Sequence, residues 1–498
     1  WVESGVFFLL LAILLWAPLV KGGNRPLPLL TLELLALPLV AWLVWHLRDF
    51  QKLPALIKGA LLLLLLYPLL QWAPLPTAIL QWFPGQEMYL EAASLVDPDI
   101  SSWRAISIVP QATMVSWLAL LVPLVVMLVT LTLKEERLRL AVYVFLGMAT
   151  LQAILALMQY GGGSHTDFRL TPTDYGQGVG TYVNRNHLAG LLEMALPISL
   201  GLLAASIGRK REAGRYVRGG WLAKIQYALS HPPRVNAAMV FSAISVAILL
   251  GIIFSRSRTG ISLAMLGIFL AALLYGRYIG GQRSKNLTTL FAVLGLALAV
   301  EIGLAPVLDR FSVDSALEDS RWIIFVTSLN GAMAFFPFGS GLGTYPDVYG
   351  RFQPASIGLF VNHAHNDYIE FVFETGVAGL AIMAALLAAY VRRWPGLLQH
   401  AHWSRLSFMQ VGAGIGLFVM ALHGLTDYNL HIPANAIYFA FLAGVFCHRS
   451  KHRRMHDDAG ELPDTAMTEI RPDVEAPVAV SKPGLPVSGA GGQNPFAD

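Results

Sequence analysis

Two histidines, His363 and His365, stand two residues apart just before an apolar run. Three acidic residues follow them: Asp367, Glu370 and Glu374. A histidine that is neutral near pH 7 is the most common general base in enzymes, and a nearby carboxylate can fix its tautomer. Glu370 and Glu374 are four residues apart and would share one face of a helix. The pattern predicts a proton-transferring site, with a metal site or a structural role as alternatives.

Two arginines lie in the short segment Ser255-Arg-Ser-Arg-Thr-Gly260, between two apolar runs. The guanidinium groups of Arg256 and Arg258 would stay charged and can bind phosphate in a bidentate manner. The following helix is predicted to begin near Gly260, and its free N–H groups and dipole also favour an anion. The segment therefore predicts a diphosphate site at a membrane interface. The alternative is that both arginines reach lipid head groups.

Polar residues also cluster where other apolar runs begin or end. Asn184-Arg-Asn-His187 is predicted to begin a helix and could bind glycan hydroxyls or phosphate. A later turn is surrounded by His423, Asp427, Asn429 and His431. These groups, like the two motifs above, must be positioned by the apolar runs around them.

Those apolar runs dominate the chain. Of its 498 residues, 55% are hydrophobic and 13% are charged, whereas a soluble domain carries about 25% charged residues. A membrane-spanning helix needs about 20 apolar residues. Twelve runs of about this length occur, at 5–20, 27–46, 56–72, 112–133, 138–159, 184–207, 236–254, 260–276, 287–305, 370–391, 408–424 and 431–448. The sequence predicts an all-α, polytopic integral membrane protein with about twelve transmembrane helices.

Lysine and arginine indicate the orientation, because they favour the cytoplasmic side. Most of the 35 basic residues fall in short loops that are cytoplasmic if the N-terminus is. Both termini are then predicted to be cytoplasmic, and all the motifs above share the opposite face. Since the basic residues lie in these loops, they do not predict a nucleic-acid partner. The single cysteine, Cys447, excludes a disulfide framework.

Two segments differ from the rest. The outer segment 306–369 is too long for a simple connection and is predicted to be a large functional loop, or alternatively a plug or a surface for another protein. Residues 449–498 are rich in Pro, Gly, Ala and acidic residues without an apolar period, which predicts a disordered cytoplasmic tail. The transmembrane domain would therefore span residues 1–448.

Taken in order, the motifs resemble the O-antigen ligase superfamily of Gram-negative bacteria. His365-Asn366, nine residues and then Gly376-Val-Ala-Gly379 are similar to the signature at the end of that family's large periplasmic loop. Asp319-Ser-Arg-Trp322, followed by the glycine-rich stretch 337–343, resembles the family's loop pattern. The similarity covers a motif core of about residues 180–435. The superfamily includes O-antigen ligases, O-antigen polymerases and pilin oligosaccharyltransferases.

The resemblance implies a class C-like glycosyltransferase fold in the bacterial inner membrane, with a periplasmic active site. The donor would be a glycan on undecaprenyl diphosphate, transferred with inversion and without metal or cofactor. His365 would take the proton of the acceptor, with His363 as the other candidate base. Arg258, with Arg256 and Arg321, would hold the diphosphate. Six further residues are predicted to support the acceptor: Arg185, Asn186, His187, Asn366, Asp367 and Glu370.

The acceptor separates the members of the superfamily. Our first hypothesis is an O-antigen ligase, whose acceptor is lipid A-core. The alternatives are an O-antigen or exopolysaccharide polymerase, which uses another lipid-linked glycan, and a protein O-oligosaccharyltransferase. A non-enzymatic lipid-glycan transporter would instead carry charges near the bilayer midplane in repeated broken helices. The acidic residues within the predicted spans, Glu33, Glu193 and Glu301, form no such repeat.

Overall fold

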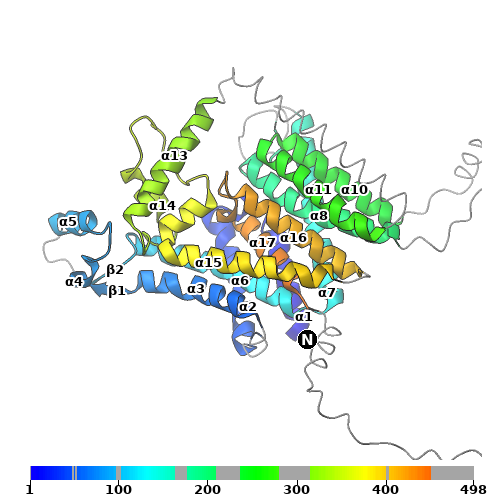
Figure 1. The fold of residues 1–498 in the computed structure, drawn as a ribbon, viewed down its shortest axis with the longest axis horizontal. Helices are drawn as coiled ribbons and strands as arrows, with labels where there is room; N and C mark the ends of the chain where they lie inside the picture. The colour runs from blue at the N-terminus through cyan, green and yellow to red at the C-terminus, as the bar shows by residue number, and fades with distance from the viewer. Residues whose placement is uncertain are drawn as a thin grey trace, which may run out of the picture. The chain divides into compact units, whose positions relative to one another are not determined.

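The computed structural model describes residues 2–46, 50, 53–96, 103–162, 177–208, 236–279, 315–399 and 403–449. Long helices dominate these ranges (Figure 1). Nine of the described helices are long and apolar enough to cross a membrane: α2 (Pro26–Trp45), α3 (Ala55–Trp72), α6 (Pro110–Thr132), α7 (Glu135–Gly161), α8 (Arg185–Gly208), α10 (Ala237–Ser255), α11 (Arg258–Ile279), α15 (Asp367–Leu398) and α16 (Arg405–His423). Two shorter apolar helices are α1 (Val2–Trp16) and α17 (Pro433–Cys447).

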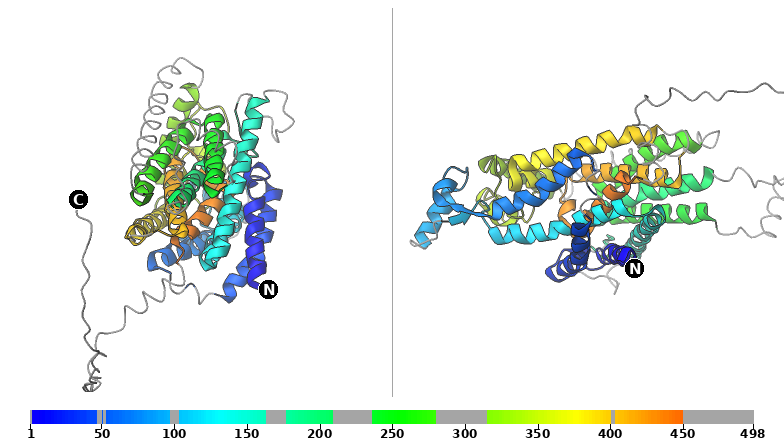
Figure 2. Two further views of the ribbon diagram at one scale, coloured as in Figure 1. Left: turned by 90° about the vertical axis from the view of Figure 1, so that its right-hand side faces the viewer. Right: turned by 90° about the horizontal axis from the view of Figure 1, so that it is seen from below.

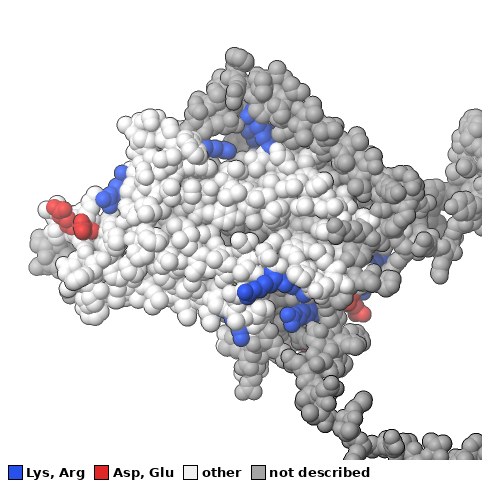
Figure 3. All heavy atoms as spheres, in the orientation of Figure 1, with Lys and Arg blue, Asp and Glu red and all other residues white. Residues whose placement is uncertain are grey.

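The prediction of an all-α polytopic membrane protein is confirmed. Eleven of the twelve predicted spans correspond to the helices named above, while the predicted span 287–305 and the predicted tail lie outside the described residues. Helices are expected here because the bilayer offers no water to satisfy backbone N–H and C=O groups. Most of the described atoms visible in Figure 3 belong to residues that are neither acidic nor basic, as a lipid-facing surface requires.

Helix α8 lies at the centre of the bundle, with 89% of its spanning stretch buried. It packs against α7, α10, α11 and α16 (Figure 1). Glycine allows close approaches between these helices: a Cβ on Gly412 of α16 would lie 2.7 Å from the Cα of Ile198. Small residues are typical where membrane helices pack backbone to backbone.

Helix α15 changes direction at Gly376, which has φ +58°. The glycine-rich turn 337–343 docks on this break, where the Val377 N–H donates to the Pro337 carbonyl at 2.8 Å. Gln71 of α3 joins the two segments, because its amide donates to the Glu374 carbonyl at 2.8 Å and accepts from the Leu342 N–H at 3.1 Å. The first turns of α15, with their acidic residues, are thus oriented separately from its long apolar part.

The described part of the predicted loop 306–369 contains regular structure. It begins with α13 (Ser315–Ala334) and continues through α14 (Tyr345–Val348) and the 3₁₀ turn η5 (Tyr349–Arg351). Aromatic side chains form its core, among them the stacked pair Tyr345–Tyr349, whose ring centroids are 5.0 Å apart. The segment therefore packs around a small hydrophobic core that it shares with Phe373 of α15.

The remaining elements are short and connect the long helices in sequence. They are the 3₁₀ turns η1 (Lys21–Gly23) and η6 (Asn429–His431), the helices α4 (Thr77–Leu80) and α5 (Glu87–Val96), and the strands β1 (Pro74–Pro76) and β2 (Trp103–Ala105). Helices α4 and α5 and the two strands lie at one edge of the molecule (Figure 1). The two strands pair antiparallel, with Leu75 opposite Arg104.

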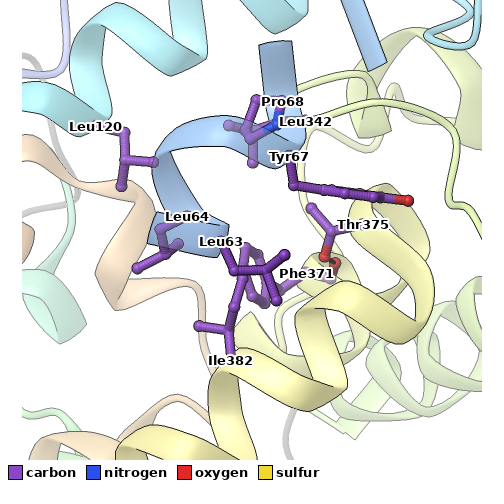
Figure 4. Close-up of a pocket in the computed structure, with 9 residues that line it drawn as sticks. All are labelled: Leu63, Leu64, Tyr67, Pro68, Leu120, Leu342, Phe371, Thr375 and Ile382. Atoms are coloured by element: carbon purple, nitrogen blue, oxygen red, sulfur yellow. Dashed lines mark hydrogen bonds between the residues drawn. The ribbon is translucent and has the colours of Figure 1, made fainter. Parts of the chain in front are cut away.

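A small apolar pocket lies between α3, α6 and α15 (Figure 4). Its lining residues are Leu63, Leu64, Tyr67, Pro68, Leu120, Leu342, Phe371, Thr375 and Ile382. The two hydroxyls among them are already used, because Tyr67 donates to the Phe338 carbonyl at 2.6 Å and Thr375 donates to the Phe371 carbonyl. The pocket surface is therefore apolar, and the titratable groups of interest lie elsewhere.

Substitution of Gly376 by alanine is expected to destabilise the protein. A Cβ at this position would lie 2.1 Å from the Pro337 carbonyl oxygen, in a left-handed conformation that costs about 1–3 kcal/mol for a side chain. Thermal unfolding of the detergent-solubilised protein measures the effect. Gly59→Ala is the matched control, because Gly59 lies within α3 and a Cβ there meets nothing within 4 Å. Equal melting temperatures for the two variants would contradict the proposed role of the break.

Candidate functional site

Polar residues from six helix ends converge at one end of the bundle. Helices α8, α11, α15 and α17 begin there, and α10 and α16 end there. Helices α10 and α11 pack beside α8, and α11 also packs against α16 (Figure 2), so consecutive helices of opposite direction return the chain to this end. The opposite ends of α6, α15 and α17 also meet, where Arg393 donates to the His448 carbonyl and the His448 ring lies 2.8 Å from the Leu133 carbonyl.

His365 faces a buried carboxylate. Its Nδ1 lies 3.5 Å from Oδ1 of Asp427, which is 1% exposed. His365 has a left-handed backbone, with φ 50°, in the turn that precedes α15. The next residue, Asn366, caps this helix by accepting the N–H groups of Tyr368 and Ile369. A carboxylate beside Nδ1 favours a proton on that nitrogen and leaves Nε2 as the basic atom.

Asp427 is held in its ionised form. Burial by itself would raise its pKa, but His365 and His187 beside it hold the pKa well below the ordinary value for an aspartate. The Nε2 of His187 is 3.9 Å from Oδ1 of Asp427. The Tyr428 N–H also donates to this oxygen, at 2.9 Å.

A chain of hydrogen bonds connects Asp427 with the arginine turn. The amide of Asn186 donates to Oδ2 of Asp427 at 2.7 Å, and the hydroxyl of Ser257 donates to Oδ1 of Asn186 at 2.8 Å. Ser257 stands between Arg256, which is exposed with φ 58°, and Arg258, which begins α11. The motifs at 184–187, 255–260 and 363–368 are therefore parts of one site.

A second cluster surrounds Glu370. The Nδ1 of His363 lies 2.8 Å from Oε1 of Glu370, and the Nε2 of His431 lies 3.2 Å from the same oxygen. The other ring nitrogen of His431 is 2.9 Å from Oδ1 of Asp367. Burial would lower the pKa of His431, but the two carboxylates raise it to about 10. His431 is therefore a cation in this cluster.

The same cluster has the composition of a metal site. His363, Glu370 and His431 offer one ligand atom each, within 4.8 Å of one another. Imidazole and carboxylate ligands together suit several divalent metals. However, the distances of 2.8 and 3.2 Å are those of charge-assisted hydrogen bonds. These contacts do not test whether a metal takes part in the reaction, so the absence of a metal stays a prediction.

Tyr428 occupies the centre of the site and was not predicted from the sequence. Its ring is stacked on His363, with centroids 4.1 Å apart, and meets the rings of His365 and His187 edge-on at 5.1 and 4.8 Å. Burial raises its pKa to about 12, and a hydrogen bond from Asn184 opposes this shift. The signal in the sequence was its position directly after Asp427.

The other predicted site residues lie in different surroundings. Arg185 donates to Oε1 of Gln177 at 2.9 Å. Arg321 of α13 is near enough to lower the pKa of Tyr428. Glu374 is buried beside Glu370, as its helical spacing predicted, but it accepts the Tyr345 N–H and thereby supports α14.

A further buried pair was not assigned a role from the sequence. His423 and Glu193 are both fully buried and lie 2.9 Å apart within the bundle. Helix α16, which ends at His423, connects this pair to the end of the bundle that carries the site.

Comparison with known families agrees with this geometry. A family model described as O-antigen ligase matches residues 243–384, which include the arginine turn and the histidine motif. This match over part of the chain confirms the resemblance to the O-antigen ligase superfamily and supports a membrane glycosyltransferase of the O-antigen ligase or polymerase kind. No curated protein matches the chain.

Replacement of His431 by glutamine is expected to destabilise this O-antigen ligase-like protein in a pH-dependent manner. Because its folded pKa is raised to about 10 from an ordinary value near 6.5, the charged ring stabilises the fold fully below pH 6.5. That contribution is lost as the pH rises through about 10. The difference in melting temperature between wild type and variant should therefore shrink from pH 6 to pH 10. A constant difference would show that the charge of His431 does not stabilise the fold.

Proposed function

We propose that the protein transfers a glycan from undecaprenyl diphosphate to an acceptor hydroxyl on the periplasmic side of the bacterial inner membrane. The main support is the hydrogen-bonded chain from Ser257 through Asn186 to Asp427, which joins the arginine turn to His365. Such a transfer needs an anion-binding group and a base near each other, and these residues connect the two. The lipid chain of the donor would remain in the bilayer.

His365 is the base in this proposal. Its Nε2 takes the proton of the acceptor hydroxyl as the oxygen bonds to the anomeric carbon, and the bond from that carbon to the diphosphate oxygen breaks. Attack opposite the leaving group inverts the anomeric configuration. Asp427 then stabilises the charged ring of His365, because it lies beside Nδ1.

The diphosphate leaves with its negative charge, so the second requirement is a set of fixed cations. Arg258, supported by Arg256 and Arg321, stabilises this charge as the bond breaks. Since the arginines supply the positive charge and His365 accepts the proton, the reaction as proposed needs no metal and no cofactor.

The acceptor that we propose is lipid A-core, as for an O-antigen ligase. A polymerase or a protein O-oligosaccharyltransferase would use the same base and the same arginines. A lipid-glycan transporter is the proposal from another class, but it does not require a histidine oriented by a buried carboxylate.

Transfer from an undecaprenyl-diphosphate glycan, measured with EDTA present, tests the function directly. Lipid A-core, a second lipid-linked glycan and a pilin peptide are offered as acceptors. His365→Ala and Arg258→Ala are each expected to lower the rate by about 10²–10⁴-fold, as for loss of a base or of an oxyanion-stabilising group. His46→Ala and Arg139→Ala, at the other end of the bundle, are matched controls. No transfer to any acceptor by the wild type would favour the transporter, and undiminished transfer by His365→Ala would exclude this base.

Asp427→Asn is expected to lower kcat by about 10²–10⁴-fold with a smaller change in the KM of the donor. The amide N–H of asparagine can donate a hydrogen bond to Nδ1 of His365. This contact favours the tautomer that carries the proton on Nε2, and Nε2 then cannot act as a base. The measurement is steady-state kinetics with the productive acceptor. A kcat within twofold of the wild type would show that His365 does not depend on Asp427.

A further inference from the structure

Four residues of the site have no part in the proposed chemistry. The transfer needs one base, and His365 with Asp427 supplies it. His363, Glu370, His431 and Asp367 form a second, separately bonded cluster beside it. The two carboxylates are 1% and 5% exposed, so the acidic groups of the cluster are buried, and the two histidines are their partners.

The positions of the protons follow from the contacts of His431. Both of its ring nitrogens lie within 3.2 Å of carboxylate oxygens, one of Asp367 and one of Glu370. Both contacts are satisfied at once when both nitrogens of His431 donate, which makes the ring a cation between two ionised carboxylates.

His363 contacts the same carboxylate. Glu370 is ionised and lies 2.8 Å from Nδ1 of His363, so this nitrogen also donates. The second oxygen of Glu370 accepts the Ala364 N–H at 2.7 Å, which holds the carboxylate in place. In the neutral ring of His363 the remaining nitrogen, Nε2, can only accept a hydrogen bond.

The rings of His363 and His365 both contact the ring of the same tyrosine. The Tyr428 ring stacks on His363 and meets His365 with its edge. Their side chains are 22% and 26% exposed, respectively, so both remain accessible from outside the protein. The site therefore offers two neighbouring histidines whose Nδ1 atoms both face carboxylates.

We propose that His363 accepts a hydrogen bond from a second hydroxyl of the acceptor, next to the hydroxyl that His365 deprotonates. This inference rests on the proposed function and specifies its acceptor class. A sugar ring presents neighbouring hydroxyls and can satisfy both histidines, whereas a serine or threonine side chain has one hydroxyl. The acceptor is accordingly a saccharide, as in a ligase or a polymerase, and not a protein side chain.

The test compares acceptors that differ by one hydroxyl. Methyl hexopyranosides and their monodeoxy analogues serve as acceptors for wild type, His363→Ala and His363→Gln. His363→Ala is expected to raise the KM of the productive glycoside on the order of tenfold, the usual effect of one lost hydrogen bond. The KM of the analogue that lacks the second hydroxyl should change much less, because that hydrogen bond is already missing.

The glutamine variant distinguishes binding from base catalysis. Its amide can donate to Glu370 and accept from a hydroxyl, but it cannot take up a proton. Partial recovery of KM by His363→Gln supports the proposal. An equal rise in KM for the glycoside and its deoxy analogue overturns it, as does a fall in kcat alone that glutamine does not recover. The latter result would make His363 the base.

Binding without a donor separates this inference from the proposed function. Saturation-transfer NMR of the same methyl glycosides with the full-length protein in detergent needs no transfer reaction. The proposal is supported, even if no transfer is found, when the wild-type signal weakens on removal of one hydroxyl from the glycoside. The signal of the complete glycoside should then weaken to the same extent when His363 is replaced by alanine. Identical signals from all the glycosides would overturn the acceptor site while leaving a measured transfer reaction intact.

Discussion

The arrangement of the site depends on the hydrogen-bond and charge partners that its buried carboxylates require at one end of the membrane bundle. Asp367, Glu370 and Asp427 are each 5% exposed or less. A buried charge without a partner is costly, and the cost rises as water is excluded. Histidines and backbone N–H groups from separate chain segments meet this requirement. The same contacts that stabilise the carboxylates therefore bring together the beginnings of α8, α11 and α15 and the turn after α16.

Two features of the bundle make this arrangement possible. The closely packed glycines between α8 and α16 bring His187 and Asp427 to the same end without intervening bulk. The turn 337–343 holds α15 at its break through Gln71, so that the first turns of this helix can face the histidines. Neither feature takes part in the proposed reaction, but the distances between the residues of the site depend on both.

Hydropathy predicted the long helices well, because a bilayer leaves few alternatives for an apolar run of 20 residues. Residue types and their order also predicted that the arginine and histidine motifs share a face. The partners within the site were harder to predict. Pairing of His365 with Asp427 spans 62 positions of sequence, and the central place of Tyr428 depends on three-dimensional packing. The break at Gly376 was seen only as part of a signature, because a glycine within an apolar run does not disclose its φ angle.

The break in α15 also separates two kinds of selective pressure. The residues before Gly376 are constrained by their contacts within the site. Most residues after it are constrained by lipid and by the neighbouring helices. Because the direction of the helix changes between them, the two halves can accumulate substitutions without a shared helical register. A substitution in the apolar part after the break can therefore alter the packing of that part without rotating the carboxylates that precede it.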